Sequence, residues 1–274
     1  WSKLSRLPKL FGDRGIQVRD ASADKGGPAE TGGQAFFRNP QTAEKYPPII
    51  LTMRREEDGG RFSGSETERL RLLKQAITLK PAYTAVDLEE DLNDQELVLS
   101  LQNMGIGIIR SFHDFSGIPL NLPGRIQDLP HSPYEVPKAA VFPKSSADLL
   151  AFTRSAFHLL PGRQILVAMG DYGLPSRILS RRFGSMLSYC SAGKNTAAPG
   201  HLSPELLARQ YRYHDIDRDT EVFGVIGNPI MHSRSPEYHN SRFSEELLCA
   251  VYLPFLVDDL SSFFQFASLI GIRG

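Results

Sequence analysis

The chain has 274 residues, of which 41% are hydrophobic and 23% charged, so it is long enough for one large globular domain or two small ones. Lysine plus arginine and aspartate plus glutamate both number 31, and a formal net charge of zero argues against nucleic acid and an anionic membrane as partners. The sequence shows no apolar run long enough to span a membrane and no signal peptide, and its two cysteines favour reduced thiols in a cytoplasmic protein over a disulfide framework or a zinc site.

The first 46 residues differ in composition from the rest of the chain. They are rich in Gly, Ala, Asp and Pro and predict an irregular segment, in which only Gly15–Val18 could form a short strand. From residue 47 onward, apolar runs typical of buried strands alternate with segments that have apolar residues at helical spacing. Strands are expected at residues 48–54, 82–89, 106–115, 135–143, 164–171 and 185–192. Helices are expected at residues 65–79, 91–105, 124–129, 145–160, 174–184 and 203–214.

This alternation predicts a parallel α/β structure, either an open sheet or a (β/α)8 barrel. The barrel is favoured because ionisable side chains stand where several strands end, and in a barrel all of these ends open on the face that carries the active site. Six strands do not close an eight-stranded barrel, so we expect a barrel that is incomplete at its N-terminal side. The strand-end residues are Arg54, Glu89, His113, Lys138 and Asp171.

Lys138 stands inside a strand in which its neighbours Val136, Ala139 and Val141 are apolar. Burial disfavours an ammonium ion, so the sequence predicts a lowered pKa for Lys138 and an amine that can attack a carbonyl group. A lone lysine at a strand end more often reaches into solvent. His113, at the end of the preceding strand, favours the functional interpretation, because imine-forming chemistry needs an amine and a group that moves protons.

Four further residues are candidates for binding an anionic substrate or for orienting the imidazole. Arg54 follows the first clear strand, and Asp58 precedes a double glycine in a charged loop that could equally be solvated. Arg177 stands at a helix start after a glycine turn, a suitable place for a carboxylate. His201 follows a Pro-Gly pair in a loop that could act as a lid.

Six motifs, taken in order, resemble those of the type I 3-dehydroquinate dehydratases over residues 48 to 212: ILTMRREEDGG, AVDLEEDL, RSFHDF, VPKAAVFP, VAMGDYGLPSR and AAPGH. The resemblance implies a TIM-type barrel at residues 47–214 and a lyase of the shikimate pathway, which leads to chorismate and the aromatic amino acids. Its reaction would be the dehydration of 3-dehydroquinate to 3-dehydroshikimate through a lysine Schiff base, with no metal and no organic cofactor. It implies Lys138 as the imine-forming residue, His113 as the proton shuttle, and Arg54 and Arg177 as substrate-binding residues.

The sequence departs from the family pattern at several positions. Asp58 stands where the family more often has Glu, so its contact with His113 must be re-spaced by one methylene. In the closing loop, Ala197 replaces a common Ser and His201 replaces a common Gln, which changes the hydrogen bonds available to substrate hydroxyls. The family's early Glu-x-Arg-x-Asp strand has only a partial counterpart at Gln17–Asp20.

A second pattern begins near residue 220. Val222–Asn240 predicts a strand, a glycine turn and a helix start, and it resembles the start of the substrate-binding domain of shikimate dehydrogenases, which follows the dehydratase in bifunctional enzymes. Ser233 and Ser235 are then expected to hydrogen-bond a polyhydroxylated carboxylate, although Ser235-Pro236 also suits a helix N-terminus. The family implies NADP for the complete dehydrogenase. The NADP-binding domain is expected to be absent here, because no G-x-G-x-x-G loop occurs, and residues 220–274 are expected to be a truncated, inactive half.

Two other interpretations remain open for this chain, which we expect to be a fragment cut at both ends. Another Schiff-base barrel of the aldolase type would share the strand lysine, and a non-catalytic remnant of the bifunctional enzyme would share the motifs without activity. The expected partner is a small molecule (3-dehydroquinate, 3-dehydroshikimate or shikimate). If the two domains are independent, removing the residues after about 218 should leave dehydratase activity unchanged.

Overall fold

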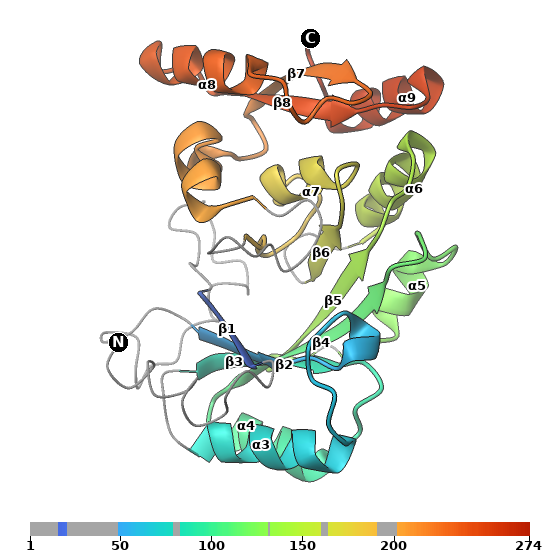
Figure 1. Cartoon of the computed structure of the whole chain (residues 1–274), viewed down its shortest axis with the longest axis vertical. Helices are drawn as coiled ribbons and strands as arrows, with labels where there is room; N and C mark the ends of the chain where they lie inside the picture. Colours follow the sequence, from blue (N-terminus) through green and yellow to red (C-terminus); the bar gives the residue numbers. More distant parts are fainter. Residues whose placement is uncertain (1–15, 21–48, 79–82, 131, 160–163, 191–201) are drawn as a thin grey trace. The chain divides into compact units, whose positions relative to one another are not determined.

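The computed structural model describes residues 16–20, 49–78, 83–130, 132–159, 164–190 and 202–274 (Figure 1). The chain falls into two compact units, and each is described by itself. The first comprises residues 1–113 and 127–138, and the second comprises residues 114–126 and 139–274.

A sheet of six strands, hydrogen-bonded in chain order from β1 to β6, organises the N-terminal two thirds of the described chain. β2 pairs with β3, and β3 with β4, in parallel, whereas β1 lies antiparallel to β2. Parallel strands joined by helices are what the alternating sequence pattern predicts. The strands are β1 (Ile16–Asp20), β2 (Ile49–Met53), β3 (Tyr83–Glu89), β4 (Gly107–Asp114), β5 (Glu135–Val141) and β6 (Ile165–Ala168).

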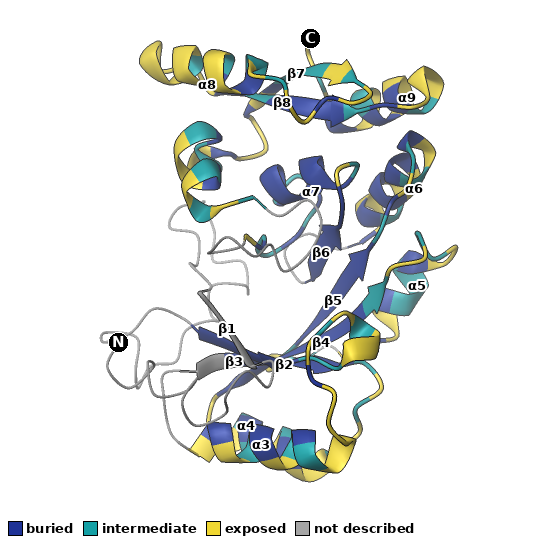
Figure 2. Cartoon of the chain, in the orientation of Figure 1, coloured by how far each residue is buried: buried dark blue, intermediate teal, exposed yellow. Residues whose placement is uncertain are grey.

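The core of the first unit lies between β2 to β4 and the helices α3 (Glu66–Thr78) and α4 (Gln95–Asn103). Every residue of β2 is buried, as expected for a continuous apolar run with neighbours on both faces (Figure 2). α3 turns Leu72, Leu73, Ala76 and Ile77 toward this core, a spacing that follows the helical period. These apolar contacts fix the strands whose ends carry the charged side chains described below.

Helix starts in both units are set by polar caps. Asp94 accepts a hydrogen bond from the N–H of Leu97 before α4, and Ser145 accepts one from Asp148 before α6 (Ser146–Phe157). Each satisfies a backbone donor that the first helical turn leaves without a partner. The remaining short helices of this part of the chain are η2 (Glu56–Asp58), α5 (Leu122–Gln127), α7 (Leu174–Ile178), η3 (Leu206–Gln210) and η4 (Tyr213–Asp215).

The C-terminal part of the second unit is built on two parallel strands, β7 (Glu221–Gly227) and β8 (Ala250–Leu256). The register pairs Gly224 with Leu253, and a Cβ on Gly224 would lie only 2.2 Å from the ring of Phe255, so a glycine is needed there. Phe255 in turn packs against aromatic side chains of the following helix, with ring centroids 5.5 Å and 6.1 Å apart. The two helices of this part are α8 (Ser235–Glu245) and α9 (Leu260–Ile270).

The helices expected at residues 174–184 and 203–214 are shorter than expected, and two expectations about strands also differ from the structure. The strand expected at residues 185–192 does not form over the described residues 185–190, where Ser185 makes only an isolated bridge to Gln164. The Ser185 hydroxyl accepts the Leu166 N–H at 2.9 Å, which replaces a backbone ladder bond with a side-chain bond. At the N-terminus, the short strand that the sequence allowed does form as β1, but its antiparallel direction differs from that of a parallel barrel strand.

Candidate active site

Asp87, in the middle of β3, is the centre of a charged cluster in the first unit. Its Oδ2 accepts hydrogen bonds from Lys138 Nζ at 2.7 Å and from Arg54 Nη2 at 2.9 Å. Its Oδ1 accepts one from Ser111 Oγ at 2.6 Å. The cluster joins the strands β2, β3, β4 and β5, because each of these four residues belongs to a different strand or directly follows one.

The carboxylate of Asp87 is held in its ionised form. Burial by itself would raise the pKa of Asp87, but the positive charges of Lys138 and Arg54 outweigh burial and hold the pKa well below its usual range. His113, one position before the end of β4, lowers it further through its own charge. Two cations on one carboxylate are therefore a stable arrangement here.

Lys138 is 2% exposed, and its neighbours on β5 are buried apolar residues. The expected burial of this lysine is thus found, but its ammonium group is compensated by the ion pair with Asp87. Such a pair favours the charged form, so the amine must lose a proton before it can attack a carbonyl group. The ion pair therefore holds the Lys138 ammonium in a fixed position, next to the guanidinium of Arg54 on the same carboxylate.

Arg69, on α3, braces the ends of the two strands that carry Arg54 and Asp87. Its side chain is fully buried, and its Nη1 lies 2.8 Å from the Met53 carbonyl oxygen, at the end of β2, and 2.7 Å from Glu89 Oε2, at the end of β3. Its Nε and Nη2 donate to the carboxylate of Glu66 at 2.8 Å and 2.7 Å. Burial raises the pKa of Glu89, and the charge of Arg69 offsets part of this rise.

The double glycine after Asp58 shapes the turn that follows β2. Gly59 has a φ of 76°, which favours glycine, and a Cβ on Gly60 would lie 2.1 Å from the carbonyl oxygen of Arg54. The Asp58 carboxylate accepts a hydrogen bond from Arg55 Nε at 2.6 Å. The predicted contact of Asp58 with His113 would therefore compete with this ion pair.

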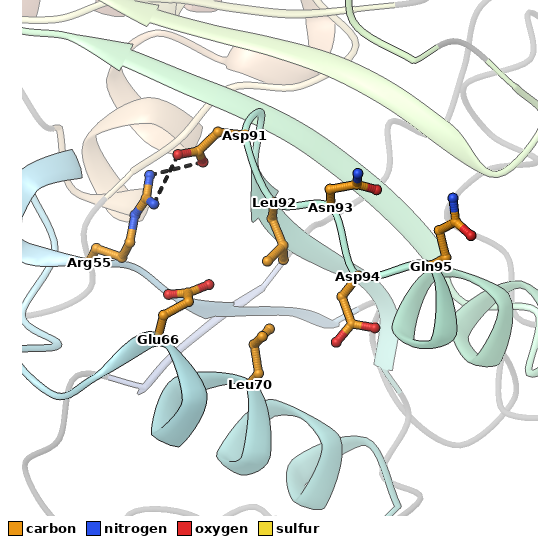
Figure 3. A pocket seen from close by; sticks show the side chains of 8 residues that line it. All are labelled: Arg55, Glu66, Leu70, Asp91, Leu92, Asn93, Asp94 and Gln95. Atoms are coloured by element: carbon orange, nitrogen blue, oxygen red, sulfur yellow. Dashed lines mark hydrogen bonds and ion pairs between the residues drawn. The ribbon is translucent and has the colours of Figure 1, made fainter.

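An open hollow of about 660 Å³ lies beside Arg55 (Figure 3). The Arg55 guanidinium makes two hydrogen bonds of 3.1 Å to Asp91 across its rim. The other carboxylates of the hollow already have structural partners, since Glu66 holds Arg69 and Asp94 caps α4. The hollow is thus a surface feature of the α3 and α4 side, and its lining does not include Lys138.

Arg177, the second predicted substrate-binding arginine, belongs to the second unit. It lies on α7, is 2% exposed, and its Nη1 donates to the Tyr189 carbonyl oxygen at 3.4 Å. The turn before it is tight, because Ser176 Oγ accepts the Ala168 N–H at 3.0 Å and donates to the Gly173 carbonyl at 2.8 Å. This turn fixes the direction in which α7 leaves β6.

The remaining predicted site residues lie elsewhere. Ser233 and Ser235 stand at the start of α8, where Ser233 Oγ accepts the N–H of Ser235 at 3.3 Å. His201 and the departure at Ala197 lie outside the described residues. The structure therefore brings together Arg54 and Lys138, with His113 close enough to influence the same carboxylate.

The sequence analysis missed Asp87 and Ser111 as site residues. Asp87 is part of a motif used for the family resemblance, yet it is buried and has three side-chain partners. A carboxylate inside an apolar strand, as in "TAVDLE", is a signal that could have identified it, because buried carboxylates are almost always paired. Ser111 carries no such signal, since serine is common in strands and loops alike.

Two further properties bear on the chemistry of the site. Among the described residues there is no group of three or more His, Cys, Asp or Glu side chains that could hold a metal ion. Within the same residues, no helix is long and apolar enough to cross a membrane.

Comparison with protein families places this cluster in context. Residues 37–218 match the model of the type I 3-dehydroquinases, and residues 225–274 match that of the shikimate dehydrogenase substrate-binding domain. The chain belongs to the type I 3-dehydroquinase family. This match includes the strands of the charged cluster, and the predicted family resemblance of both segments is confirmed.

Curated relatives include one bifunctional protein and a separate dehydratase. The chain is 31% identical over 236 residues to the chloroplastic bifunctional 3-dehydroquinate dehydratase/shikimate dehydrogenase of Arabidopsis thaliana, a match that covers 83% of this chain and 38% of that protein. It is 33% identical over 175 residues to a 3-dehydroquinate dehydratase of Methanocaldococcus jannaschii, covering 63% and 78% of the two chains. The chain thus spans well under half the length of the bifunctional relative.

Solved structures support the fold. A dehydroquinate dehydratase and shikimate dehydrogenase from S. pombe aligns with a TM-score of 0.51 and 26% identity, over 78% of this chain and 41% of that one. A 3-dehydroquinate dehydratase from Geobacillus kaustophilus aligns with a TM-score of 0.50 and 24% identity, over 59% and 65%, and shows the fold alone. The predicted class, a TIM-type α/β fold followed by the start of a shikimate-binding domain, is confirmed.

Proposed function

We propose that this protein is a lyase that dehydrates 3-dehydroquinate to 3-dehydroshikimate through a Schiff base on Lys138. The observation that carries the proposal is the buried Lys138 ammonium, held 2.7 Å from Asp87 in a cluster that also contains Arg54. A buried strand lysine with a fixed direction suits a nucleophile that must meet a ring ketone in one orientation. Family membership and the names of the relatives support the same reaction.

The proposed reaction begins with the neutral amine of Lys138. Its nitrogen attacks the ring ketone, water leaves, and a protonated imine forms that withdraws electrons from the neighbouring carbon. His113 removes the proton from that carbon, and the resulting enamine expels the β-hydroxyl group, to which the imidazolium returns the proton. Hydrolysis of the imine consumes one water and frees the amine, so the overall change is the loss of one water from the substrate.

Other residues have supporting roles in this proposal. Arg54 and Arg177 bind the negatively charged and hydroxylated substrate, because a guanidinium offers paired donors to a carboxylate. Asp87 holds Lys138 and Arg54 in place. Asp58 and His201 stay proposed contributors, Asp58 by orienting the imidazole and His201 by closing the site.

The test is the absorbance of the conjugated enone product when the purified chain meets 3-dehydroquinate. We expect product from the native chain, none from Lys138→Ala, and covalent capture of the native chain by borohydride in the presence of substrate. Lys74→Ala is the matched control, because Lys74 is an exposed lysine of the same unit that pairs with Glu96 at 2.9 Å. Capture with an aldol substrate but not with 3-dehydroquinate would favour an aldolase-type barrel. A folded native chain that forms neither product nor adduct would favour a non-catalytic remnant.

For the C-terminal segment we propose only a share in shikimate binding, through Ser233 and Ser235. NADP is the cofactor that we propose for a complete dehydrogenase, whereas the dehydration needs none. The glycines of β7 do not fit a pyrophosphate cradle, since Gly224 is required for packing against Phe255 and Gly227 lies within a strand. No hydride-transfer step is therefore assigned to the described residues.

Small-molecule binding follows from family membership. We propose that the chain acts on its substrate without nucleic acid or membrane, in keeping with its zero net charge. A cytoplasmic location also stays a proposal, and the name of the Arabidopsis relative describes that protein as chloroplastic.

A further inference from the structure

Within the second unit, the segment that matches the dehydratase and the segment that matches the dehydrogenase are packed against each other. Helix α6 of the former contacts helix α9 of the latter (Figure 1). Their contact is apolar at its centre, where both segments line one narrow crevice and its aromatic side chains are largely buried. The crevice is lined by Leu149, Tyr172 and Pro175 on one side and by Phe255, Phe263 and Phe266 on the other.

Asp258, between β8 and α9, forms the polar end of this contact. Its Oδ1 accepts the backbone N–H of Ser146 at 2.8 Å, and its own N–H donates to Ser146 Oγ at 3.2 Å. Tyr172 lies near the Asp258 carboxylate, and burial together with the negative charge of Asp258 raises the pKa of the Tyr172 hydroxyl. Because Ser146 is the first residue of α6, the carboxylate lies at the positive end of that helix. The N–H of Ser146 is the main cause of a lowered pKa at Asp258.

The opposite end of α9 is held by an arginine of the dehydratase segment. Arg182 Nη1 donates to the Ile270 carbonyl oxygen at 2.6 Å, and its Nη2 donates to the carbonyl oxygens of Thr220 and Arg218. A cation at a helix C-terminus is favourable for the same reason as an anion at an N-terminus. Each segment therefore supplies the charged group that completes a helix end of the other.

Ser146 and Tyr172, the two residues beside Asp258, each follow a strand of the dehydratase segment. Ser146 lies after β5, the strand of Lys138, and Tyr172 lies in the turn between β6 and α7. The Gly173 backbone is in close contact with the end of β6, since a Cβ there would lie 2.2 Å from the Ala168 carbonyl oxygen. Tyr172 directly precedes this N-cap of α7, the helix that carries the buried Arg177.

We propose that the dehydrogenase-type segment clamps the β5–α6 and β6–α7 loops of the dehydratase segment, and that Asp258 is a positioning residue for substrate binding by Arg177. The inference rests on the proposed dehydratase function. It predicts that the two segments are not independent. Asp258 acts through Ser146 and Tyr172 and does not touch the substrate.

The test compares Asp258→Ala with Asp259→Ala in the full chain. Both variants remove one carboxylate from the same loop, but the hydrogen bonds that Asp259 accepts from described residues come from Ser261 and Ser262 of its own helix. Loss of a bond that positions a binding group is expected to raise KM for 3-dehydroquinate about fivefold in Asp258→Ala and to leave kcat nearly unchanged. Tyr172→Phe, which removes one hydroxyl on the other side of the contact, is expected to raise KM in the same direction.

Amide hydrogen exchange gives a second readout that needs no turnover. The amides of Ser146, Tyr172 and Gly173 are expected to exchange faster in Asp258→Ala and at the native rate in Asp259→Ala. An equal KM for Asp258→Ala and the native chain, or equal effects of the two variants, would overturn the inference while leaving the proposed function intact. If the native chain forms no product, the proposed function fails, and unchanged exchange in Asp258→Ala would overturn the clamp as well.

Discussion

Asp87 and Asp258 differ in burial and in the kind of group that donates hydrogen bonds to the carboxylate. Asp87 is 3% exposed, lies within a strand, and is bonded by two cationic side chains and a hydroxyl. Asp258 is exposed, lies in a loop, and is bonded by the backbone N–H of Ser146. In both cases the pKa of the carboxyl lies below its usual value, at Asp87 because cations outweigh burial and at Asp258 mainly because a helix N-terminus donates to it.

The difference shows how burial decides what a carboxylate contributes. Breaking an ion pair inside a protein leaves an uncompensated charge, so each member of the Asp87 cluster depends on the others. Water can take the place of an exposed carboxylate as a hydrogen-bond partner. We therefore expect Asp258 to fix the position of its loop and to add little to the free energy of unfolding. Substitutions in the two regions should therefore differ both in size and in what they change.

The largest effect is expected for Asp87→Asn. The variant leaves the ammonium of Lys138 buried without its ion pair, which should cost about 3–5 kcal/mol in the free energy of unfolding. Turnover should fall at least about a hundredfold, because Lys138 and Arg54 lose their common anchor. Chemical denaturation and the enone absorbance measure the two quantities on the same preparation.

Asp91→Asn is the matched control for that variant. Asp91 is a carboxylate of the same unit that pairs with Arg55 at 3.1 Å, but its side chain is exposed. Its replacement should change stability by less than about 1 kcal/mol, as for other exposed ion pairs. Similar losses in the two variants would show that burial does not set the strength of the Asp87 cluster.

A smaller loss is expected for Arg69→Met. The variant leaves Glu89 buried and without its cation, and it removes the bond to the Met53 carbonyl. Glu89 can take up a proton because burial already raises its pKa, so the cost should be about 3 kcal/mol, at the lower end for a broken buried pair. The bonds of Asp87 stay in place, and turnover should fall less than in Asp87→Asn.

The comparison variant is Arg71→Met on the exposed side of the same helix, where Arg71 bonds only Gln75 among its described contacts. The denaturation midpoints of Arg69→Met and Arg71→Met measure the difference in stability between the two variants. An equal midpoint for Arg69→Met and the native chain would mean that the strand ends hold their positions without the arginine.

The sequence predicted the outline of this arrangement better than its contacts. Buried apolar runs gave five of the strands, and an isolated lysine in such a run identified Lys138. The partner of that lysine is Asp87, which is 51 positions away, and Ser146 lies 112 positions from Asp258. No periodicity within one element contains such pairings, because they depend on which strands and helices become neighbours. The antiparallel direction of β1 is also a matter of pairing and not of local pattern.

The dependence of the free energy of unfolding on acidic pH should distinguish Asp87 from other carboxylates. Its folded pKa lies below that of the unfolded chain, about 3.9 for Asp, so it contributes stability that is present above pH 4. That contribution is lost as the pH falls from about 4 toward the folded pKa. The difference in unfolding free energy between the native chain and Asp87→Asn should therefore be constant near neutral pH and shrink below pH 4.

Denaturation of both proteins at a series of pH values measures this difference, and other groups cancel because they are common to both. Glu89 would act with the opposite sign, since its raised pKa makes its ionisation unfavourable to folding. A difference that grows below pH 4 would show that Asp87 is protonated in the native chain.

The smallest effects distinguish two adjacent serines at the start of α6. Ser145 Oγ accepts the N–H of Asp148 at 3.1 Å and caps its own helix, whereas Ser146 Oγ accepts the N–H of Asp258 at 3.2 Å. Ser145→Ala should lower stability by about 1 kcal/mol, as for other lost N-caps, and leave KM unchanged. Ser146→Ala should change stability less, because the bond from its backbone N–H to Asp258 remains, but it should raise KM slightly. KM and the thermal midpoint are measured for both variants. If KM is the same in both, these serines affect only the stability of the fold, and the bond from Ser146 Oγ has no part in the clamp.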